Sequence, residues 1–323
     1  MNDQTPRRYR GSLVERAAAI YAFSPPQNRS APVEPTPAAP QPAAPLHRPL
    51  FDTVEPPRAP LRPDHATPAP QPAPTGRRAV AIDRVKLAAA GMLVPGAAVT
   101  ALAEEFRLIK RQLLATSRTI RRDDDDKGRM VLVCSAKPDD GKTFCAINLA
   151  LSMAAEKDVE ILLVDADFAK PDVLNKLGAP DGVGLLDVLA GNVASAEECI
   201  VDTDVPQLSV LPAGTKSNAD TELLASARAH AILDGLAAAN PRRIVIFDSP
   251  PALAASPASV LADHVGQVMM VVRADRTTES DLREAVGLLD ACAHIQLVLN
   301  NVTFQPGGRR FGSYGAYYGE PDK

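Results

Sequence analysis

The sequence has few aromatic residues, few cysteines and no surplus of positive charge, and each shortage narrows the range of possible functions. Aromatic residues make up 4% of the 323 residues, and Trp is absent. The four cysteines form no Cys-x-x-Cys pair, so small reduced thiols in a cytosolic core are expected. The net charge is −4, which argues against a general binder of nucleic acid or anionic membranes.

Long apolar runs are also missing. Met1–Arg10 is polar and basic with no apolar run behind it, so no signal peptide is expected. The most apolar stretch, residues 88–103, is interrupted by Pro95 and is too short to span a bilayer. We therefore expect a soluble, cytoplasmic chain.

Proline, by contrast, is abundant and clustered. Of the 30 prolines, 17 fall between Pro25 and Pro74, and a segment of this composition cannot form regular helix or sheet. Residues 24–78 are therefore predicted to be a disordered, semi-rigid Pro/Ala-rich linker.

The linker divides the chain into parts of different character. A globular domain is predicted over residues 79–304, and a flexible Gly- and Tyr-rich tail over residues 305–323. Residues 1–23 form a short N-terminal segment, in which Ser12 and Glu15 make a capping box for a helix over 11–23. So short a helix either docks on another surface or frays.

The globular part alternates short apolar runs with helical patterns. The runs interpreted as buried strands are 130–134, 161–164, 208–211, 244–247, 268–272 and 296–299. Buried strands separated by helices predict an α/β fold, with a doubly wound and mainly parallel sheet flanked by helices.

An amphipathic helix is predicted over residues 99–120, with Thr100 as its cap. Its apolar stripe comprises Leu102, Phe106, Ile109 and Leu113, and its polar side carries Glu104, Arg107, Lys110 and Arg111. The acidic run Asp123–Asp126 is interpreted as a solvated loop that ends this helix.

The strongest motif is Ala136–Thr143, which lies between a predicted strand and a helix predicted over residues 142–156. In a P-loop the backbone N–H groups wrap the phosphates, Lys142 bridges the β- and γ-phosphates, and Thr143 binds Mg²⁺. The predicted nucleotide-binding set comprises Lys137, Asp140, Gly141, Lys142, Thr143 and Phe144. The match is imperfect, because Ala136 replaces the usual first Gly and Asp139 and Asp140 bring negative charge near phosphate.

Carboxylates follow two further strands. Asp165 and Asp167 end one apolar run, at the sheet edge where ligands bind in this fold class, and can hold Mg²⁺ or take a proton from a nucleophile. Asp248 ends the run over residues 244–247, as the Mg²⁺-binding Asp of a Walker B strand does. Any one of these acids can instead cap a helix, but the three elements in this order predict a P-loop NTPase fold that binds nucleotide.

Three of the five tyrosines, Tyr314, Tyr317 and Tyr318, lie close together among glycines near the C-terminus. Glycine around each ring favours exposure and flexibility, which suits phosphoacceptors. A Gly/Tyr tail without chemistry is the alternative.

Taken together, these motifs resemble the bacterial tyrosine kinases that regulate polysaccharide synthesis and export. The likeness is greatest to the soluble, cytoplasmic autokinases associated with exopolysaccharide chain-length determination, and it covers about residues 99 to 320. It rests on the P-loop, on residues 165–171 and on the hydrophobic-Asp-x-Pro-Pro run over 244–251. The segments 184–191 and 208–214 are similar to family segments as well.

The resemblance implies an ATP- and Mg²⁺-dependent protein-tyrosine autokinase that phosphorylates its own C-terminal tyrosines and regulates exopolysaccharide or capsule polymerisation and export. It implies catalytic roles for Lys142, Asp165 and Asp167, with Asp165 as the candidate base for the tyrosine hydroxyl. By the same resemblance Thr143, Asp167 and Asp248 organise Mg²⁺, and Asn300 is the adenine contact.

Partners are also implied by the resemblance. Glu104, Arg107 and Lys110 resemble the Glu-x-x-Arg-x-x-Arg helix motif through which such kinases form a homo-oligomeric ring, although a solvated charged face is the alternative. Family members of this kind are activated by the cytoplasmic segment of a separate membrane protein, which would recruit the chain to the inner membrane face. A cognate tyrosine phosphatase is expected too.

Three departures from the family pattern keep alternatives open. Ala169 stands where the family has Arg, and Asp139 stands where Gly is common. Lys137 occupies the place of the signature lysine of the partitioning and septum-site ATPases. A dimerising ATPase of that type, and a nucleotide-binding but inactive scaffold, are therefore the alternative hypotheses.

Overall fold

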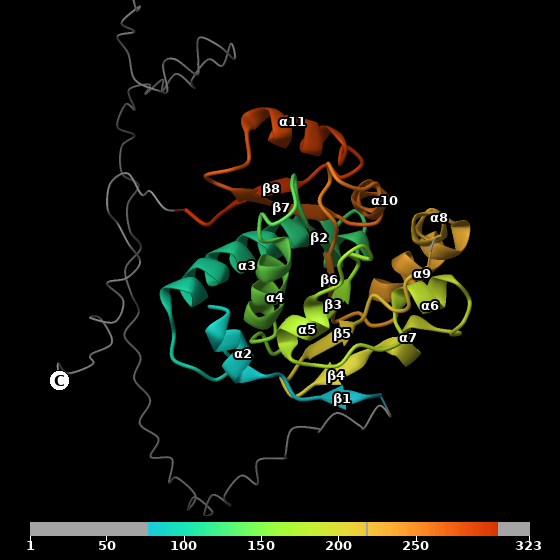
Figure 1. Cartoon of the computed structure of the whole chain (residues 1–323), viewed down its shortest axis with the longest axis horizontal. Helices are drawn as coiled ribbons and strands as arrows, with labels where there is room; N and C mark the ends of the chain where they lie inside the picture. The colour runs from blue at the N-terminus through green and yellow to red at the C-terminus, as the bar shows by residue number, and fades with distance from the viewer. Residues whose placement is uncertain (1–76, 218, 303–323) are drawn as a thin grey trace, which may run out of the picture. The chain divides into compact units, whose positions relative to one another are not determined.

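The computed structural model describes residues 77–217 and 219–302 of the chain (Figure 1). The helix predicted over residues 11–23, most of the predicted linker and the tail with its three tyrosines lie outside the described residues. Arg77 and Arg78, assigned to the linker by composition, already contact the folded domain, since the Arg78 side chain donates to the carbonyls of Pro180 and Asp181.

The centre of the described domain is an eight-stranded sheet with the order β1-β4-β5-β3-β6-β2-β7-β8 (Figure 1). In chain order the strands are β1 (Ala79–Val80), β2 (Met130–Ser135), β3 (Glu160–Asp165), β4 (Val201–Thr203), β5 (Leu208–Leu211), β6 (Arg243–Asp248), β7 (Gln267–Arg273) and β8 (Ile295–Asn300). The six strands predicted from apolar runs are all present. Most pairs are parallel, as predicted. Strands of a parallel sheet are buried on both faces, and this burial accounts for their continuous apolar runs.

The edge formed by β4 and β1 was not predicted. β4 pairs with β5 in the antiparallel sense, and β1 pairs with β4 in parallel. These two strands span only three and two residues, so neither leaves an apolar run long enough to be recognised.

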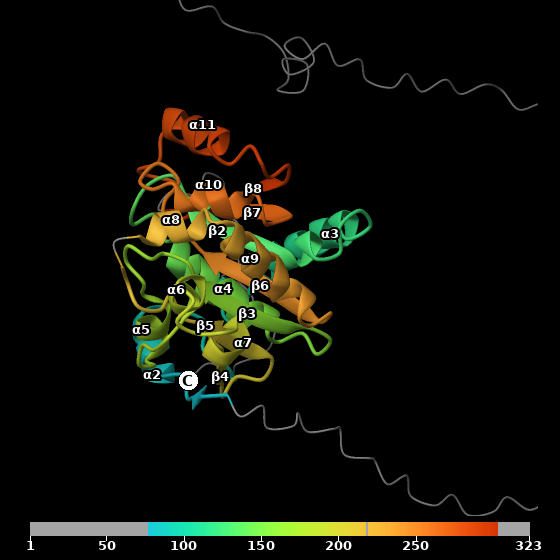
Figure 2. The same ribbon diagram turned by 90° about the vertical axis from the view of Figure 1, so that its right-hand side faces the viewer.

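Helices cover both faces of the sheet and enclose two hydrophobic cores. On one face lie α2 (Arg84–Ala89), α3 (Ala101–Ile120), α4 (Lys142–Met153) and α5 (Val173–Leu177). On the other lie α6 (Leu185–Leu189), α7 (Ala196–Cys199), α8 (Asp220–Leu224), α9 (Ala227–Ala238), α10 (Pro257–Ala262) and α11 (Glu279–Gly287). Figure 2 looks onto this second face, with α8, α9 and α10 in front of the sheet. The layers match the predicted doubly wound architecture.

Helix α3 begins where the sequence predicted, since the Thr100 side chain accepts from the Ala103 N–H at 3.2 Å. Phe106 and Leu113 are buried against the first core, as expected from the apolar stripe. The placement of Lys110 on the polar side was wrong, because its side chain is buried.

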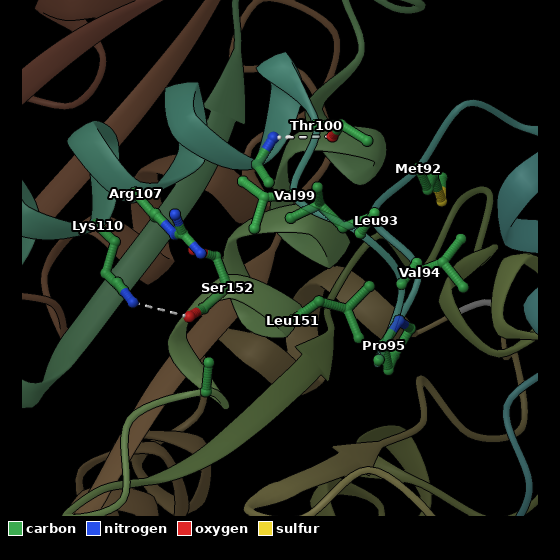
Figure 3. Close-up of a pocket in the computed structure, with 15 residues that line it drawn as sticks. Met92, Leu93, Val94, Pro95, Val99, Thr100, Arg107, Lys110, Leu151 and Ser152 are labelled. Atoms are coloured by element: carbon green, nitrogen blue, oxygen red, sulfur yellow. Dashed lines mark hydrogen bonds between the residues drawn. The ribbon is translucent and has the colours of Figure 1, made fainter. Parts of the chain in front are cut away.

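The Lys110 ammonium donates to the Ser152 carbonyl at 3.1 Å (Figure 3). It also pairs with Glu156 at 2.6 Å. Ser152 lies in the last turn of α4, where carbonyls lack helical partners and the helix dipole favours a cation. Lys110 also lines a hollow of about 260 Å³ between α3, α4 and the segment over residues 92–100. This hollow is remote from the P-loop.

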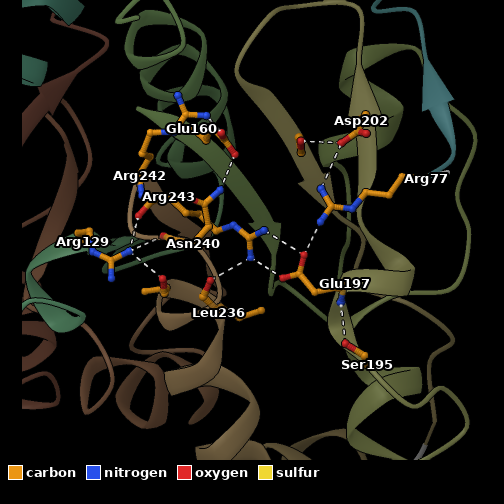
Figure 4. Close-up of polar contacts among 12 residues, drawn as sticks. Arg77, Arg129, Glu160, Ser195, Glu197, Asp202, Leu236, Asn240, Arg242 and Arg243 are labelled. Atoms are coloured by element: carbon orange, nitrogen blue, oxygen red, sulfur yellow. Dashed lines mark hydrogen bonds and ion pairs between the residues drawn. The ribbon is translucent and has the colours of Figure 1, made fainter. Parts of the chain in front are cut away.

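Arginine side chains form a network of polar contacts at the end of the sheet that lies opposite the P-loop (Figure 4). The buried Arg129, in the short helix η1 (Lys127–Arg129), donates to the carbonyls of Ala237, Asn240 and Arg243. Arg243, also buried, makes two contacts with the Glu197 carboxylate, which pairs with Arg77 as well. These bonds tie the C-terminal end of α9 to the beginnings of β2 and β6.

No helix within residues 77–217 and 219–302 is long and apolar enough to cross a membrane.

Candidate nucleotide site at the carboxyl edge of the sheet

The predicted P-loop connects β2 to α4 at the carboxyl edge of the sheet. β2 ends at Ser135 and α4 begins at Lys142, so the loop comprises residues 136–141. Gly141 has φ 97°, and a Cβ built there would lie 2.1 Å from the Asn300 amide nitrogen. Only glycine therefore suits this position.

Asp139, one of the departures from the usual motif, also has a left-handed backbone, with φ 63°. That conformation explains why glycine is common at this place, and Asp tolerates it better than most residues do. The Asp139 carboxylate is exposed and lies 3.8 Å from the Lys170 ammonium.

The strand ends bring the predicted carboxylates together. β3 and β6 are neighbours in the sheet, and Asp165 pairs in register with Asp248. Both carboxylates are buried, and Asp167 follows two residues after Asp165. The three acids thus lie together at the carboxyl edge of the sheet.

Lys142 supplies the positive charge of this cluster. Its ammonium lies 2.6 Å from the Asp167 carboxylate. Burial disfavours the charged form of Lys142, but the carboxylates of Asp248 and Asp167 outweigh burial, so the pKa of Lys142 lies above its usual value. The lysine is thus held protonated beside these carboxylates.

Asp248 is the least satisfied acid of the site. Neither carboxylate oxygen has a hydrogen-bond partner of normal geometry. Burial raises the pKa of Asp248 to about 8, and the nearby Lys142 charge opposes that rise. A buried carboxylate without donors is costly unless a cation or proton is supplied.

The donor set suits Mg²⁺, which prefers oxygen ligands and usually takes one or two carboxylates together with phosphate oxygens. The orphaned Asp248 oxygens, the Thr143 hydroxyl beside them and the Asp167 carboxylate provide such donors. Among the described residues, no group of three or more His, Cys, Asp or Glu could hold a metal by itself. The residues therefore fit a cation whose shell is completed by nucleotide.

Asp165 caps a helix as well as facing Asp248. Its carboxylate accepts from the backbone N–H groups of Asp172 and Val173, both at 3.0 Å, at the start of α5. Burial raises the pKa of Asp165 to about 7 despite these donors. The capping role considered for a single strand-end acid is thus realised here, within the same cluster.

A pocket of about 490 Å³ lies in front of these groups. Of the predicted site residues, it is lined by Gly141, Lys142, Thr143, Phe144 and Asp167. Asp165 and Asp248 are buried behind this lining rather than part of it.

Three predicted nucleotide-binding residues make contacts outside that pocket. The Lys137 ammonium pairs with Asp281 of α11 at 2.5 Å. The buried Asp140 carboxylate accepts from the Lys137 N–H at 3.1 Å and the Thr277 hydroxyl at 3.2 Å. Asn300, the predicted adenine contact, donates to the Asp140 carbonyl at 2.9 Å.

Arg273, Thr277 and Asp281 were missed by the sequence analysis. Arg273 donates to the Asp139 carbonyl, so the segment from the last residue of β7 to the first turn of α11 contacts the P-loop at three points. Their separation from the P-loop by more than 130 positions leaves no local signal. Together with Asn300 and Phe144, Arg273 lines a smaller hollow of about 210 Å³ beside the P-loop.

The segments 184–191 and 208–214, noted separately in the sequence, pack against each other. The Leu185 N–H donates to the Pro212 carbonyl, and the Asp187 carboxylate accepts from the N–H groups of Gly184 and Thr215. A Cβ at Gly184 would lie 2.1 Å from the Pro212 carbonyl oxygen. This contact fixes the loop that leaves β5.

Several known proteins are similar to this chain in sequence. A family model described as an AAA domain matches residues 128–279. The putative tyrosine-protein kinase EpsB of Ralstonia nicotianae is 33% identical over 198 residues, which cover 60% of this chain and 25% of EpsB. The putative tyrosine-protein kinase CapB of Staphylococcus aureus is 27% identical over 221 residues, 68% of this chain and 91% of CapB.

A solved structure is also similar to this chain in fold and sequence. The kinase domain of the Escherichia coli tyrosine kinase ETK is 25% identical with a TM-score of 0.51, and the match covers 62% of this chain and 80% of that domain. The chain spans about a quarter of EpsB, so the matched region is one part of that longer protein. By its motifs, its fold and these similarities, the described domain resembles the kinase domains of bacterial tyrosine-protein kinases.

Proposed function

We propose that this chain is an ATP- and Mg²⁺-dependent protein-tyrosine kinase that phosphorylates its own C-terminal cluster, Tyr314, Tyr317 and Tyr318. The observation that supports it most is the convergence of the P-loop Lys142 with Asp165, Asp167 and Asp248 at one edge of the sheet. Such a cluster provides the charge balance that phosphoryl transfer requires.

In the proposed reaction the phenolic oxygen of tyrosine bonds to the γ-phosphorus of ATP. The bond from that phosphorus to the bridging β,γ-oxygen breaks, and ADP leaves with the electron pair. The phenolic proton passes to a carboxylate, for which we propose Asp165, because its raised pKa increases its affinity for a proton. Bound Mg²⁺ would neutralise charge on the phosphates, and Thr143, Asp167 and Asp248 would hold it.

The wider role follows from the family resemblance. We propose that phosphorylation regulates exopolysaccharide or capsule polymerisation and export. The proposed partners are the cytoplasmic segment of a separate membrane activator, a tyrosine phosphatase and further copies of the chain in a ring. Within α3, Glu104 and Arg107 pair with each other on the surface, whereas Lys110 is engaged internally. We therefore propose the ring contact for the first two alone.

The test is incubation of the purified full-length chain with ATP and Mg²⁺, followed by mapping of modified residues by mass spectrometry. The Lys142→Met variant is the control, since it lacks the ammonium proposed to bind phosphate. We expect phosphate on one or more of Tyr314, Tyr317 and Tyr318 in the natural chain, and none in the variant.

Two outcomes would contradict the proposal. Steady release of ADP without phosphotyrosine would indicate an ATPase of the partitioning type. Tight ATP binding with neither product, also after addition of a candidate activator segment, would indicate a nucleotide-binding scaffold.

A further inference from the structure

The pocket of about 490 Å³ in front of Lys142 is called the phosphate pocket below. A second cavity, of about 310 Å³, adjoins it. Its walls come from three loops at the carboxyl edge: Phe168 and Ala169 after β3, Lys216 and Thr221 after β5, and Pro250 with Ser256 after β6, among others. Ala169, Pro250 and Ala255 line both this cavity and the phosphate pocket. A group bound in the cavity is therefore separated from the phosphate pocket only by a shared wall.

Three hollows lie side by side along the carboxyl edge, in the same order as the strands beneath them. The hollow lined by Arg273 and Asn300 lies over the ends of β7 and β8, and the phosphate pocket lies over β2, β6 and β3. The second cavity lies over β6, β3 and β5. It is thus on the side of the phosphate pocket away from Asn300, the proposed adenine contact.

That placement has a chemical consequence. In phosphoryl transfer the attacking oxygen and the leaving oxygen lie roughly in line through the transferred phosphorus. With the nucleotide base toward β7 and β8, the leaving oxygen lies on that side, and the attacking oxygen must come from the side of β5. The second cavity lies on that side.

The chemistry of the walls suits a phenol. Phe168, Pro250, Pro257 and Ala255 give apolar surface against which an aromatic ring can pack. Lys216, whose ammonium donates to the Ala169 carbonyl at 3.3 Å, lies at the wall shared by the two pockets. Lys170 lines the phosphate pocket next to it and is exposed. Two cations therefore lie beside the wall that the two cavities share.

The loop that carries Lys216 is held in place by named bonds. Asp187 accepts from the Thr215 N–H at 3.0 Å, one residue before Lys216. Asp220 accepts from both the N–H and the hydroxyl of Ser217 at 2.8 Å, one residue after it. The cavity wall is thus part of the folded domain.

We infer that this cavity is the acceptor subsite and takes the ring of a tyrosine followed by acidic residues, which Lys216 and Lys170 attract. The chain itself contains such a segment, since Tyr318 is followed by Glu320 and Asp322, whereas Tyr314 is preceded by Arg309 and Arg310. The inference rests on the proposed kinase function and adds which acceptor the site prefers.

The first test fills the cavity. Ser256 is exposed and its side chain makes no capping bond, so Ser256→Trp should fold. In the full-length chain with ATP and Mg²⁺, we expect tail phosphorylation to fall at least tenfold while the Kd for ATP changes less than threefold. Ala231→Trp, on the exposed side of α9, is the matched control and should behave as the natural chain does.

The second test addresses the charge. Synthetic peptides with Tyr followed by Glu and Asp, or by two Lys, are offered as acceptors. We expect the natural chain to favour the acidic peptide about tenfold in kcat/KM, and Lys216→Glu to abolish that preference. Lys157→Glu, the same charge change at an exposed site after α4, should leave it intact.

The outcomes separate the two levels of the proposal. If the natural chain forms no phosphotyrosine, the kinase function and the subsite both fail. If it phosphorylates tyrosine but Ser256→Trp does so equally well, or loses ATP binding together with transfer, a separate acceptor cavity is refuted. Equal use of both peptides by the natural chain would refute the acidic preference.

Discussion

At the scale of single residues, the site contains positions that serve ligand binding at the expense of the unliganded fold. Asp248 is buried and neither of its carboxylate oxygens has a hydrogen-bond partner of normal geometry, and Asp139 adopts a backbone conformation that suits glycine. Such local costs concentrate at functional sites. Both positions give measurable predictions.

Asp248→Asn should stabilise the chain when Mg²⁺ and nucleotide are absent. The folded-state pKa of Asp248 is raised from its ordinary value of 3.8 to about 8, so its ionised form opposes folding increasingly as pH rises between those values. We expect the melting temperature of the variant to exceed that of the natural chain by a few degrees at pH 8, roughly 1 kcal/mol or more, and by less at pH 5.

The same variant should lose the stabilisation that Mg²⁺ and ATP give the natural chain, because a bound ligand stabilises only the state that holds it. Melting curves with and without Mg²⁺ and ATP measure both effects. Asp172→Asn is a control of opposite sign, since bonds from Asn175 and Lys176 outweigh burial and lower the pKa of Asp172. A pH-independent gain for Asp248→Asn would contradict the argument.

The backbone of Asp139 can be tested by a pair of variants with the same change of charge. Asp139→Ala places an ordinary side chain at φ 63°, whereas Asp139→Gly does not. We expect the Gly variant to be more stable than the Ala variant by about 1 kcal/mol, the approximate cost of the left-handed conformation. Both should bind ATP more tightly than the natural chain, because a carboxylate beside the phosphate pocket is removed. Urea denaturation and ATP titration provide the measurements.

At the scale of secondary-structure elements, the sequence predicted what local patterns control. The six strands with continuous apolar runs, the cap of α3 at Thr100 and the position of the P-loop were correct because each depends on neighbours in sequence. The sequence placed Asp165 and Asp248 at strand ends, and the structure shows that these strands are neighbours.

Contacts between distant elements were not predictable in this way. The burial of Lys110 depends on the end of α4 lying beside α3, and the hold of Thr277 and Asp281 on the P-loop depends on where α11 packs. Charged side chains are normally exposed, so a pattern that assigns Lys110 to the polar face is reasonable in the absence of tertiary structure. The long stem of lysine allows the exception.

The bond between α7 and β6 gives the prediction at this scale. The Glu197 carboxylate pairs with the buried Arg243, and that bond chiefly lowers the pKa of Glu197. Glu197→Gln leaves the arginine charge buried with weaker partners, so we expect a loss of about 1–3 kcal/mol at neutral pH, discounted because the carboxylate is partly exposed. The network lies at the opposite end of the sheet, so ATP affinity should not change.

The pH dependence of this loss is determined by the sign of the shift. A carboxylate with a lowered folded-state pKa stabilises the fold above its unfolded value, near 4.5 for Glu197, and the contribution disappears as pH falls through the folded value. Urea denaturation should therefore show a difference in the free energy of unfolding between the variant and the natural chain at pH 7, and a smaller difference in acid. Arg242→Gln, which breaks the exposed pair with Glu160, is the control and should cost less than about 1 kcal/mol. Equal losses for the two variants would contradict the argument.

At the scale of the whole molecule, the described domain is closed at its N-terminal end by a few bonds. β1 pairs with β4, Arg77 pairs with Glu197, and Arg78 donates to the carbonyls of Pro180 and Asp181. These contacts begin at the first described residue, directly after the proline-rich stretch. The carboxyl edge, which carries the phosphate pocket and the two neighbouring hollows, belongs to the same sheet.

The N-terminal limit of the folded domain can therefore be measured. A chain beginning at residue 77 keeps β1 and both arginines, so its melting temperature should lie within about 2 °C of that of the full chain, a change of under ~1 kcal/mol. A chain beginning at residue 83 lacks these contacts and also Ile82, whose N–H donates to Asp204 at 2.9 Å. It loses an edge strand, a buried apolar side chain, one partner of Glu197 (Arg77) and one partner of Asp204 (the Ile82 N–H), so we expect a drop of roughly 5–10 °C. Since the P-loop and the strand-end acids remain in both chains, ATP should still bind each below its melting temperature. Equal melting temperatures for the two shortened chains would show that β1 adds nothing to the stability of the sheet.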